Sequence, residues 1–166
     1  MTVFTAVFNG VTISAAQDLF ELVPNATTRI RILEVEAQSY SPLDVGTEEE
    51  ILGISFWRGH TVSGSGGSTV TPANVNPYSR VSVTAAEANN TTVATTSGVM
   101  LYSTGFHVQA GFVYRPNEAP DRDPFRKHFI IKPSQRFVVR ITAPADALVG
   151  VNGTIIFEEI GKSPQD

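Results

Sequence analysis

The three histidines have the side chains with the most distinctive chemistry, because imidazole is a common metal ligand. A metal centre of the His-x-His type needs two histidines at i and i+2 on one strand face, a nearby glutamate and a later histidine. His60, His107 and His128 stand singly in the sequence, with no His-x-His pair. His107 also has the opposite strand parity to its apolar neighbours, so it should point outward. The pattern favours surface histidines over a catalytic metal.

A second candidate metal site lies in an acidic stretch of the chain. Asp121 and Asp123, with Glu118 nearby, could hold a calcium ion through carboxylate oxygens. The EF-hand pattern is absent, however, and Arg122 and Arg126 are close in sequence. Acids next to arginines more often form exposed ion pairs, so a solvated loop is the preferred interpretation.

Two other groups of polar residues resemble catalytic or nucleotide-binding motifs only in composition. The glycines of Gly64–Gly67 lack the G-x-x-x-x-G-K-[ST] pattern, and Ser65 is not in a G-x-S-x-G elbow. We interpret this tract as flexible, with contact to a partner as the alternative. Glu158 and Glu159 should point to opposite faces of a strand and cannot flank one bond. They are expected to be local charge, like the glutamates at 48–50.

Composition sets limits on function before any motif is considered. The chain has 166 residues, enough for one domain, with 42% hydrophobic and 17% charged residues and a net charge of −4. No Lys/Arg-rich block exists, which argues against nucleic acid as a partner. The absence of cysteine excludes disulfides, thiolate metal sites and a cysteine nucleophile. No apolar run approaches the roughly 20 residues of a membrane span, and no signal peptide is recognisable, so we expect synthesis in the host cytoplasm, no membrane partner and no cofactor.

Side chains alternate between apolar and polar along most of the chain, and no segment has a helical period. The dipeptide Asn9-Gly10 lies between two such runs and predicts an N-terminal hairpin or arm over residues 1–14. In 28–38 the apolar parity changes after Ile32, which favours a β-bulge. Further strands are expected at 18–23, 51–58, 80–85, 91–95, 99–102, 106–115, 128–132, 136–142 and 154–160.

Two long polar connections separate these runs, at 59–79 and 115–127, and residues 162–166 should form a flexible tail. Long connections suit Greek-key crossovers better than an up-and-down meander. We therefore predict a single all-β domain over 1–166, an antiparallel β-sandwich of jelly-roll (Greek-key) topology with about eight main strands plus the N-terminal hairpin.

Several side chains on outward strand positions are of a kind that usually avoids water. Trp57 has the opposite parity to the apolar residues of its strand, so it is either exposed or covered from outside the sandwich. Val113 and Val138 are apolar at outward positions, and Arg136 and Arg140 share the face of Val138. A subunit partner would cover such residues. The predicted interface residues are Trp57, Val113, Arg136, Val138 and Arg140.

The segment KPSQRFVVRITAPADALVGVNGTIIFEEI, at 132–160, has a strand, a Pro-x-x turn, an apolar strand and a final strand after a long connection. Together with 18–36 and the paired strands at 99–115, it resembles the jelly-roll capsid decoration (cement) proteins of tailed bacteriophages. That resemblance implies a non-enzymatic virion structural protein on the capsid surface. It also implies a homotrimer whose partner is the major capsid protein or another virion protein.

Two other functions are compatible with the sequence. The first is a carbohydrate- or receptor-binding module of a phage tail or spike, which would need clustered aromatics and paired Asp or Asn on adjoining loops. The second, ranked lower, is a cupin-like metalloenzyme built on the histidines.

Overall fold

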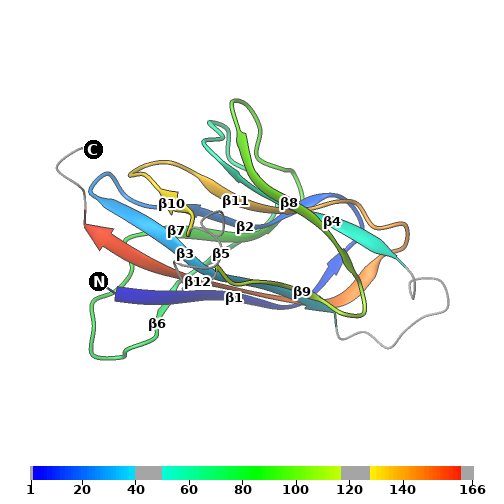
Figure 1. Cartoon of the computed structure of the whole chain (residues 1–166), viewed down its shortest axis with the longest axis horizontal. Helices are drawn as coiled ribbons and strands as arrows, with labels where there is room; N and C mark the ends of the chain where they lie inside the picture. Colours follow the sequence, from blue (N-terminus) through cyan, green and yellow to red (C-terminus); the bar gives the residue numbers. More distant parts are fainter. Residues whose placement is uncertain (1, 40–49, 117–127, 162–166) are drawn as a thin grey trace, which may run out of the picture.

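The computed structural model describes residues 2–39, 50–116 and 128–161, and it consists of two antiparallel sheets packed face to face (Figure 1). The first sheet has the order β10-β3-β12-β1-β6, with β9 also paired to β3, and the second has the order β5-β7-β2-β11-β4-β8. Among these described residues there is no helix that could span a membrane. The predicted antiparallel β-sandwich is confirmed.

The strand boundaries follow the alternation in the sequence closely for the longer strands. The first sheet contains β1 (Thr2–Ile13), β3 (Thr28–Ser39), β6 (Ala73–Asn74), β9 (Phe112–Tyr114), β10 (Ile130–Ile131) and β12 (Leu148–Gly161). The second contains β2 (Gln17–Val23), β4 (Ile51–Arg58), β5 (Ser68–Val70), β7 (Ala85–Asn90), β8 (Val99–His107) and β11 (Phe137–Ile141).

The strands pair in a nested order. β1 pairs with β12, β2 with β11, β3 with β9, and β4 with β8, all antiparallel. The first half of the chain is thus wound against the second half, and β5, β6 and β7 are additions between β4 and β8. This order positions β2, β11 and β4 side by side at the centre of the second sheet.

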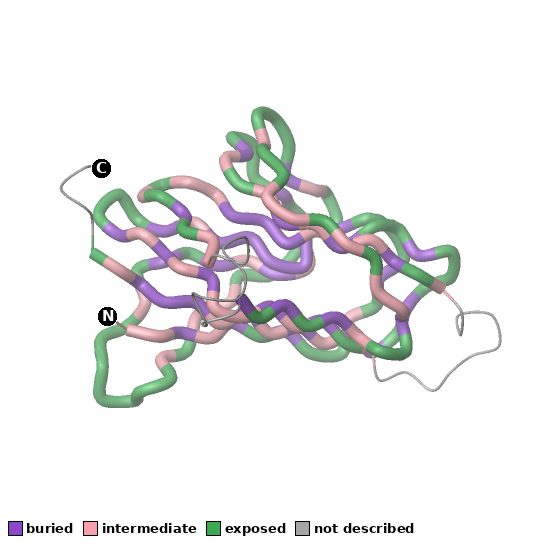
Figure 2. Tube along the Cα trace, in the orientation of Figure 1, coloured by how far each residue is buried: buried purple, intermediate pink, exposed green. Residues whose placement is uncertain are grey.

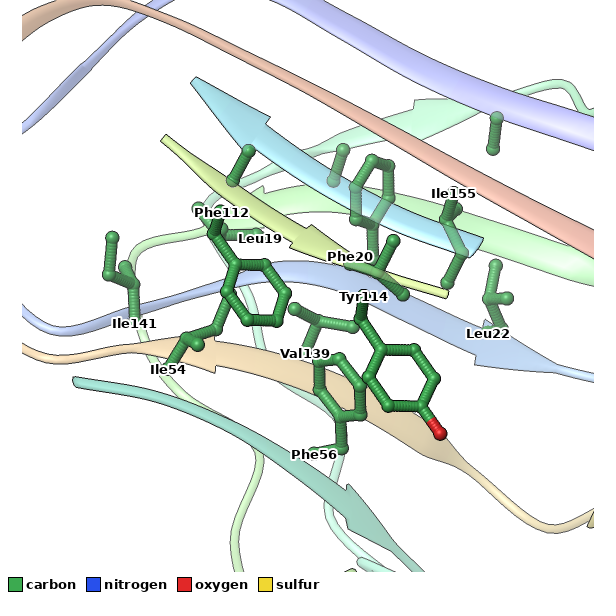
Figure 3. Packing of buried hydrophobic residues seen from close by; sticks show 14 of the residues in the cluster. Leu19, Phe20, Leu22, Ile54, Phe56, Phe112, Tyr114, Val139, Ile141 and Ile155 are labelled. Atoms are coloured by element: carbon green, nitrogen blue, oxygen red, sulfur yellow. The ribbon is translucent and has the colours of Figure 1, made fainter. Parts of the chain in front are cut away.

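An aromatic cluster fills the space between the two sheets. Phe56 on β4 is fully buried and faces Phe112 and Tyr114 of β9 in the opposite sheet (Figure 3). Their ring centroids lie 6.0 and 5.1 Å from that of Phe56, in edge-to-face arrangements. The apolar face of each sheet is therefore used by the sandwich itself, and function has to be sought on the outer faces and in the connections.

The bulge predicted in 28–38 is confirmed. The pairing of β3 with β12 shifts between Ile32 and Glu34, so that Leu33 has no residue opposite it. Ile30 and Ile32 are buried before the shift and Val35 after it. One extra residue restores the inward direction of the apolar side chains, which is what a bulge does.

The predicted hairpin at Asn9-Gly10 is wrong. β1 runs continuously through these residues and stays paired to β12, with a register shift between Phe8 and Val11. Gly10 has a φ of 69°, and its N–H donates to Oδ1 of Asn152 at 3.0 Å. Asn-Gly supplies a positive φ that a bulge uses as readily as a turn, so the local signal was real but did not distinguish the two.

Other segments also differ from the prediction. Residues 106–115 are not one strand, because β8 ends at His107 and the chain crosses through Gly111, with a φ of 69°, to β9 in the other sheet. The connection at 59–79 contains β5 and β6, and β7 replaces the strand predicted at 80–85. Most of the predicted loop at 115–127 and the tail at 162–166 lie outside the described residues, as does Tyr40.

Gly153 of β12 tests how tightly the core is packed. A Cβ added there would overlap the ring of Phe8 and lie 3.1 Å from the ring of Phe20. We expect Gly153→Ala to lower the free energy of unfolding in urea by about 1–3 kcal/mol through overpacking. Gly161→Ala is the matched control, because nothing lies within 4 Å of its added Cβ. Equal stability of the two variants would contradict this packing.

Candidate interaction surface

The structure brings most of the predicted interface residues together on the outer face of the second sheet. Trp57 of β4 lies directly opposite Val138 of β11, and Arg136 and Arg140 flank Val138 on the same side. Val113 is on β9 in the first sheet and is separate from this group. It is 57% exposed, and its role as an interface residue stays a prediction.

Two buried carboxylates of β2 pair with the two arginines. Nε of Arg140 lies 2.6 Å from Oδ1 of Asp18, and its Nη2 donates to Oδ2 of the same carboxylate at 3.2 Å. Nε of Arg136 lies 2.5 Å from Oε1 of Glu21. The side chains of Asp18 and Glu21 are 0% and 3% exposed. Buried charges of this kind need an opposite charge and further hydrogen bonds to be tolerated.

The further hydrogen bonds come from a projecting part of the chain, residues 59–67 and 91–98, called the ribbon below. Its two segments are joined by the bridges Val62–Thr95 and Ser65–Thr92, and it rises from the second sheet in Figure 1. The N–H of Ala94 donates to Oδ2 of Asp18 at 2.6 Å, and the C=O of Ala94 accepts from Arg140 at 2.6 Å. One ion pair thus satisfies both backbone groups of one ribbon residue.

The second ion pair holds the other segment of the ribbon in the same way. Glu21 accepts hydrogen bonds from the hydroxyl of Ser63 at 2.5 Å and from the N–H of Gly64 at 2.9 Å. Arg136 donates through Nη1 to the C=O of His60 at 2.7 Å. Because each segment is bound by a different ion pair, the base of the ribbon is fixed to the sheet at both sides.

The ribbon changes the interpretation of the predicted interface. Val138 is fully buried although it points away from the sandwich core, and Ala94 of the ribbon is fully buried as well. Trp57 is half-buried, packs against Arg140 with the guanidinium carbon 5.7 Å from the ring centroid, and donates to Ser55. The protein's own chain therefore supplies the cover that was expected from a subunit at Val138, Arg136 and Arg140. Most residues of the ribbon are exposed, and its buried residues are His60, Gly64 and Ala94 (Figure 2).

The glycine tract 64–67 is packed, which corrects its interpretation as a flexible loop. A Cβ on Gly64 would lie 2.8 Å from the side-chain nitrogen of Asn90 and from the C=O of Thr92, and Gly66 has a φ of 83°. A Cβ on Gly67 would overlap the C=O of Ala88. These glycines allow the ribbon to lie directly on the neighbouring backbone.

His60 is also not the surface residue that was expected. It is 7% exposed, its ring lies 5.6 Å from that of Trp57, and Gly98 packs so closely that a Cβ there would overlap the imidazole. Neither ring nitrogen has a hydrogen-bond partner among the described residues. Next to it lies an open groove of about 570 Å³, lined by Gly59, His60, Thr61, Lys132, Pro133, Ser134, Gln135 and Arg136.

The other predicted chemical sites yield no metal centre in the described part of the chain. No group of three or more His, Cys, Asp or Glu side chains there could hold an ion. His107 and His128 are half-buried. The acidic stretch around Asp121 and Asp123, including Glu118, lies outside the described residues, as do the glutamates at 48 and 49.

Glu159 is the important residue that the sequence analysis missed. It was expected to be surface charge, but it is 1% exposed, and its Oε1 accepts from Ser82, from the N–H of Val83 and from both the N–H and hydroxyl of Thr84, at 2.7–3.1 Å. Its Oε2 lies 2.6 Å from Nη2 of Arg80. Glu158 is 4% exposed and pairs with Arg31 at 3.5 Å. The only local sign was that this glutamate follows the apolar run Ile155–Phe157 in a strand.

One exposed charge cluster lies on the first sheet. Nη2 of Arg115 lies 2.6 Å from Glu34 and 2.9 Å from Glu36. The hydrogen bond from Arg115 lowers the pKa of Glu34, whereas the hydrogen bond with Glu34, together with partial burial, raises the pKa of Glu36. The hydrogen bond between the two carboxyl groups therefore shifts their pKa values in opposite directions, while Arg115 acts to lower both.

Comparisons with known proteins leave the family open. No protein-family model and no curated protein sequence matches the chain. Among solved structures, the VP16–VP17 complex of bacteriophage P23-77, a complex of its two major capsid proteins, is 10% identical with a TM-score of 0.22, over 96% of this chain and 100% of that one. VP17 of the same phage is 8% identical with a TM-score of 0.17, over 98% and 99%.

A third structure, from infectious bursal disease virus, is 16% identical with a TM-score of 0.14, over 98% of this chain and 42% of that one. All three are structures of viral proteins or particles. TM-scores this low do not establish a shared fold.

The role of the Arg140–Asp18 ion pair in holding the ribbon to the second sheet can be tested with Arg140→Gln. Loss of the guanidinium leaves the carboxylate of Asp18 buried without its counter-charge, so we expect the free energy of unfolding to fall by about 3–5 kcal/mol. Hydrogen exchange should also accelerate at residues 91–98. Arg115→Gln is the matched control, an exposed arginine whose removal should change stability by less than about 1 kcal/mol. Similar losses in the two variants would show that the buried pair does not hold the ribbon.

The cluster of Glu34, Glu36 and Arg115 predicts that the stability of the fold depends on pH. A raised pKa in the folded state means that Glu36 stabilises the fold at low pH and loses this contribution as the pH rises through its folded pKa. Glu36→Gln has no carboxyl group to ionise at this position, so the variant does not lose stability there as the pH rises. Glu34 has a lowered pKa and still stabilises the fold above its unfolded pKa. We expect the urea midpoint of Glu36→Gln, relative to the unmodified protein, to be higher at pH 7 than at pH 4. The same difference at both pH values would contradict the raised pKa.

Proposed function

We propose that this protein is a non-enzymatic structural component of a virion, a decoration or stabilising protein that binds the capsid surface as a homotrimer. The observation that carries this proposal is the use made of the buried ionisable groups. Asp18, Glu21 and Glu159 are each bonded to backbone groups of a projecting segment and to an arginine. They hold binding elements in place on a stiff scaffold and are not arranged around a shared space for a substrate.

The strand order supports a jelly-roll topology. In a jelly roll, two Greek keys are wound together, so that the first strand pairs with the last and the inner strands pair in turn. The nested pairs β1–β12, β2–β11, β3–β9 and β4–β8 follow this order. Jelly rolls occur in viral capsid proteins, in lectin domains and in cupins, so topology alone leaves all three functions open.

A carbohydrate- or receptor-binding module is the second candidate, and the groove beside His60 favours it. Its lining offers hydroxyl, amide and cationic groups, and Oε1 of Gln135 is buried there without a partner among the described residues. The lining contains no Trp, Tyr or Phe, however, whereas sugar sites commonly use an aromatic ring face. A glycan array would detect this function.

A cupin-like enzyme has less support. It would need a cluster of metal ligands, and the described residues contain no such group. Metal analysis of the purified protein would decide the matter, with a stoichiometric bound metal favouring the enzyme.

The proposed function predicts a defined assembly and a defined partner. Light scattering of the purified protein at micromolar concentration should give a mass of about three times 17.9 kDa. The protein should also co-sediment with capsid shells assembled from the major capsid protein of its virus. A monomeric mass would remove the trimer, and failure to co-sediment would remove the capsid-surface role.

A further inference from the structure

The open groove beside His60 is lined by two residues with buried polar atoms that lack a hydrogen-bond partner among the described residues. These atoms are both ring nitrogens of His60 and Oε1 of Gln135. His60 as a whole is 7% exposed. Buried polar groups in proteins are nearly always bonded to other protein groups, to water or to a ligand. Because both residues line the groove, a molecule bound there is placed to supply the bonds that these atoms need.

The packing around His60 uses the faces of its ring. A Cβ added to Gly98 would lie 2.0 Å from Cε1 of His60, and 2.4 and 2.5 Å from Nδ1 and Nε2. The distances to the nitrogens are too short for a position in the ring plane beyond Cε1, so Gly98 lies over the face of the ring. The ring of Trp57 is also close, with the two centroids 5.6 Å apart and an angle of 35° between the planes. The nitrogens of imidazole form hydrogen bonds in the ring plane, so Gly98 does not block them.

Hydrogen bonds hold both walls of the groove in place. On one wall, the N–H of Gly59 donates to the C=O of Arg136 at 2.8 Å, and Arg136 donates to the C=O of His60 at 2.7 Å. On the other wall, the N–H of Ser134 donates to the C=O of Pro24 at 3.0 Å. Ligand sites are usually formed before the ligand arrives, and these bonds give the groove that property.

One positive charge in the groove has no counter-charge among the described residues. Arg136 is paired with the buried carboxylate of Glu21. Lys132 is exposed and forms no ion pair with a described residue. A single free ammonium group matches a ligand group with one negative charge, such as a carboxylate. It matches a phosphate monoester less well, because that group carries up to about two negative charges at neutral pH.

The other lining groups are suited to the hydroxyl groups of a ligand. Oε1 of Gln135 can only accept a hydrogen bond, so its partner must be a donor. The neutral imidazole of His60 has one donor and one acceptor nitrogen, and a hydroxyl can serve either. Thr61 and Ser134 add exposed hydroxyls of their own, and Pro133 is the apolar side chain in this lining. Most ligand pockets are chiefly apolar, so a lining this polar favours a strongly polar ligand.

We infer that the groove beside His60 binds a sugar that carries a carboxylate, with the carboxylate at Lys132 and hydroxyl groups at Gln135 and His60. This inference rests on the second candidate function and specifies the class of sugar. It does not depend on the capsid role, because a capsid protein and a receptor-binding module can both contain such a groove. The lack of an aromatic ring in the lining matters less for a ligand that is held by charge and hydrogen bonds than for a neutral sugar.

NMR titration of the isotope-labelled protein with glucuronate, glucose, acetate and inorganic phosphate tests the class of ligand. Glucuronate should bind with a Kd of about 1 mM or lower and shift the signals of the His60 ring and the Gln135 side-chain amide. Glucose lacks the carboxylate, and acetate and phosphate lack the sugar hydroxyls, so each should bind at least about tenfold more weakly. Acetate or phosphate binding as tightly as glucuronate would show a simple anion site and overturn the inference.

Variants of two lining residues test the assigned contacts. Lys132→Gln should raise the Kd for glucuronate about tenfold and leave that for glucose unchanged, because only the carboxylate contacts Lys132. Its urea midpoint should not change, since Lys132 is exposed. Gln135→Leu removes the buried acceptor and should weaken the binding of both sugars. Arg115→Gln is the matched control, because it removes the same charge from the first sheet and should bind glucuronate normally.

The remaining outcomes separate this inference from the proposed functions. If about 10 mM glucuronate shifts neither His60 nor Gln135, the inference is wrong, and co-sedimentation with shells still decides the capsid role. Binding of neutral sugars alone would keep the second candidate function and overturn the choice of an acidic sugar. Equal affinity of Lys132→Gln and the unmodified protein for glucuronate would contradict the carboxylate contact. If glucuronate binds as expected and the protein does not co-sediment with shells, the sugar site stands and the capsid role is removed.

Discussion

The constraint on which the second sheet depends is the presence of two buried carboxylates, Asp18 and Glu21, on its outer face. A carboxylate with little access to water is unstable unless it has a counter-charge and several donors. The neighbouring strand β11 supplies Arg140 and Arg136, and the ribbon supplies backbone N–H groups. Sheet and ribbon are therefore mutually dependent, since neither half of this polar layer is satisfied without the other.

The same device recurs on the first sheet. Glu159 of β12 binds Arg80 and the backbone N–H groups of Val83 and Thr84, so a buried carboxylate again holds a connection that lacks regular secondary structure. Both projections lie in the insertion between β4 and β8. The eight nested strands act as the scaffold, and the inserted segment supplies the surfaces that project from it. In β-sandwich proteins, a rigid scaffold of strands commonly positions the loops that make the binding surface.

The sequence predicted the parts of this structure that depend on short-range periodicity. Alternation located β2, β4 and β11 and the change of face in β3, because an error of one residue would place an entire apolar face in water. It failed at Asn9-Gly10, where a bulge and a turn require the same backbone conformation. It also could not anticipate the crossing from β8 to β9 at Gly111, since the apolar parity continues across that break.

The candidate site was predicted in part, and for reasons that have to be corrected. Parity placed Trp57, Arg136, Val138 and Arg140 on one outer face, as the structure does. The sequence could not show that this face is covered, because the covering contacts join residues far apart in the chain. Ala94 is separated from Asp18 by 76 residues and Ser63 from Glu21 by 42. Periodicity gives the direction of a side chain, but what lies in that direction is decided by tertiary structure.

An apolar residue at an outward position therefore has two explanations, a partner or a covering segment of the same chain, and burial distinguishes them. Val138 has no exposed surface in the single chain, so the chain itself covers it, whereas Val113 remains exposed. The distinction extends to charge. Arg136 and Arg140 looked available for a partner, but both are bonded to carboxylates within the chain.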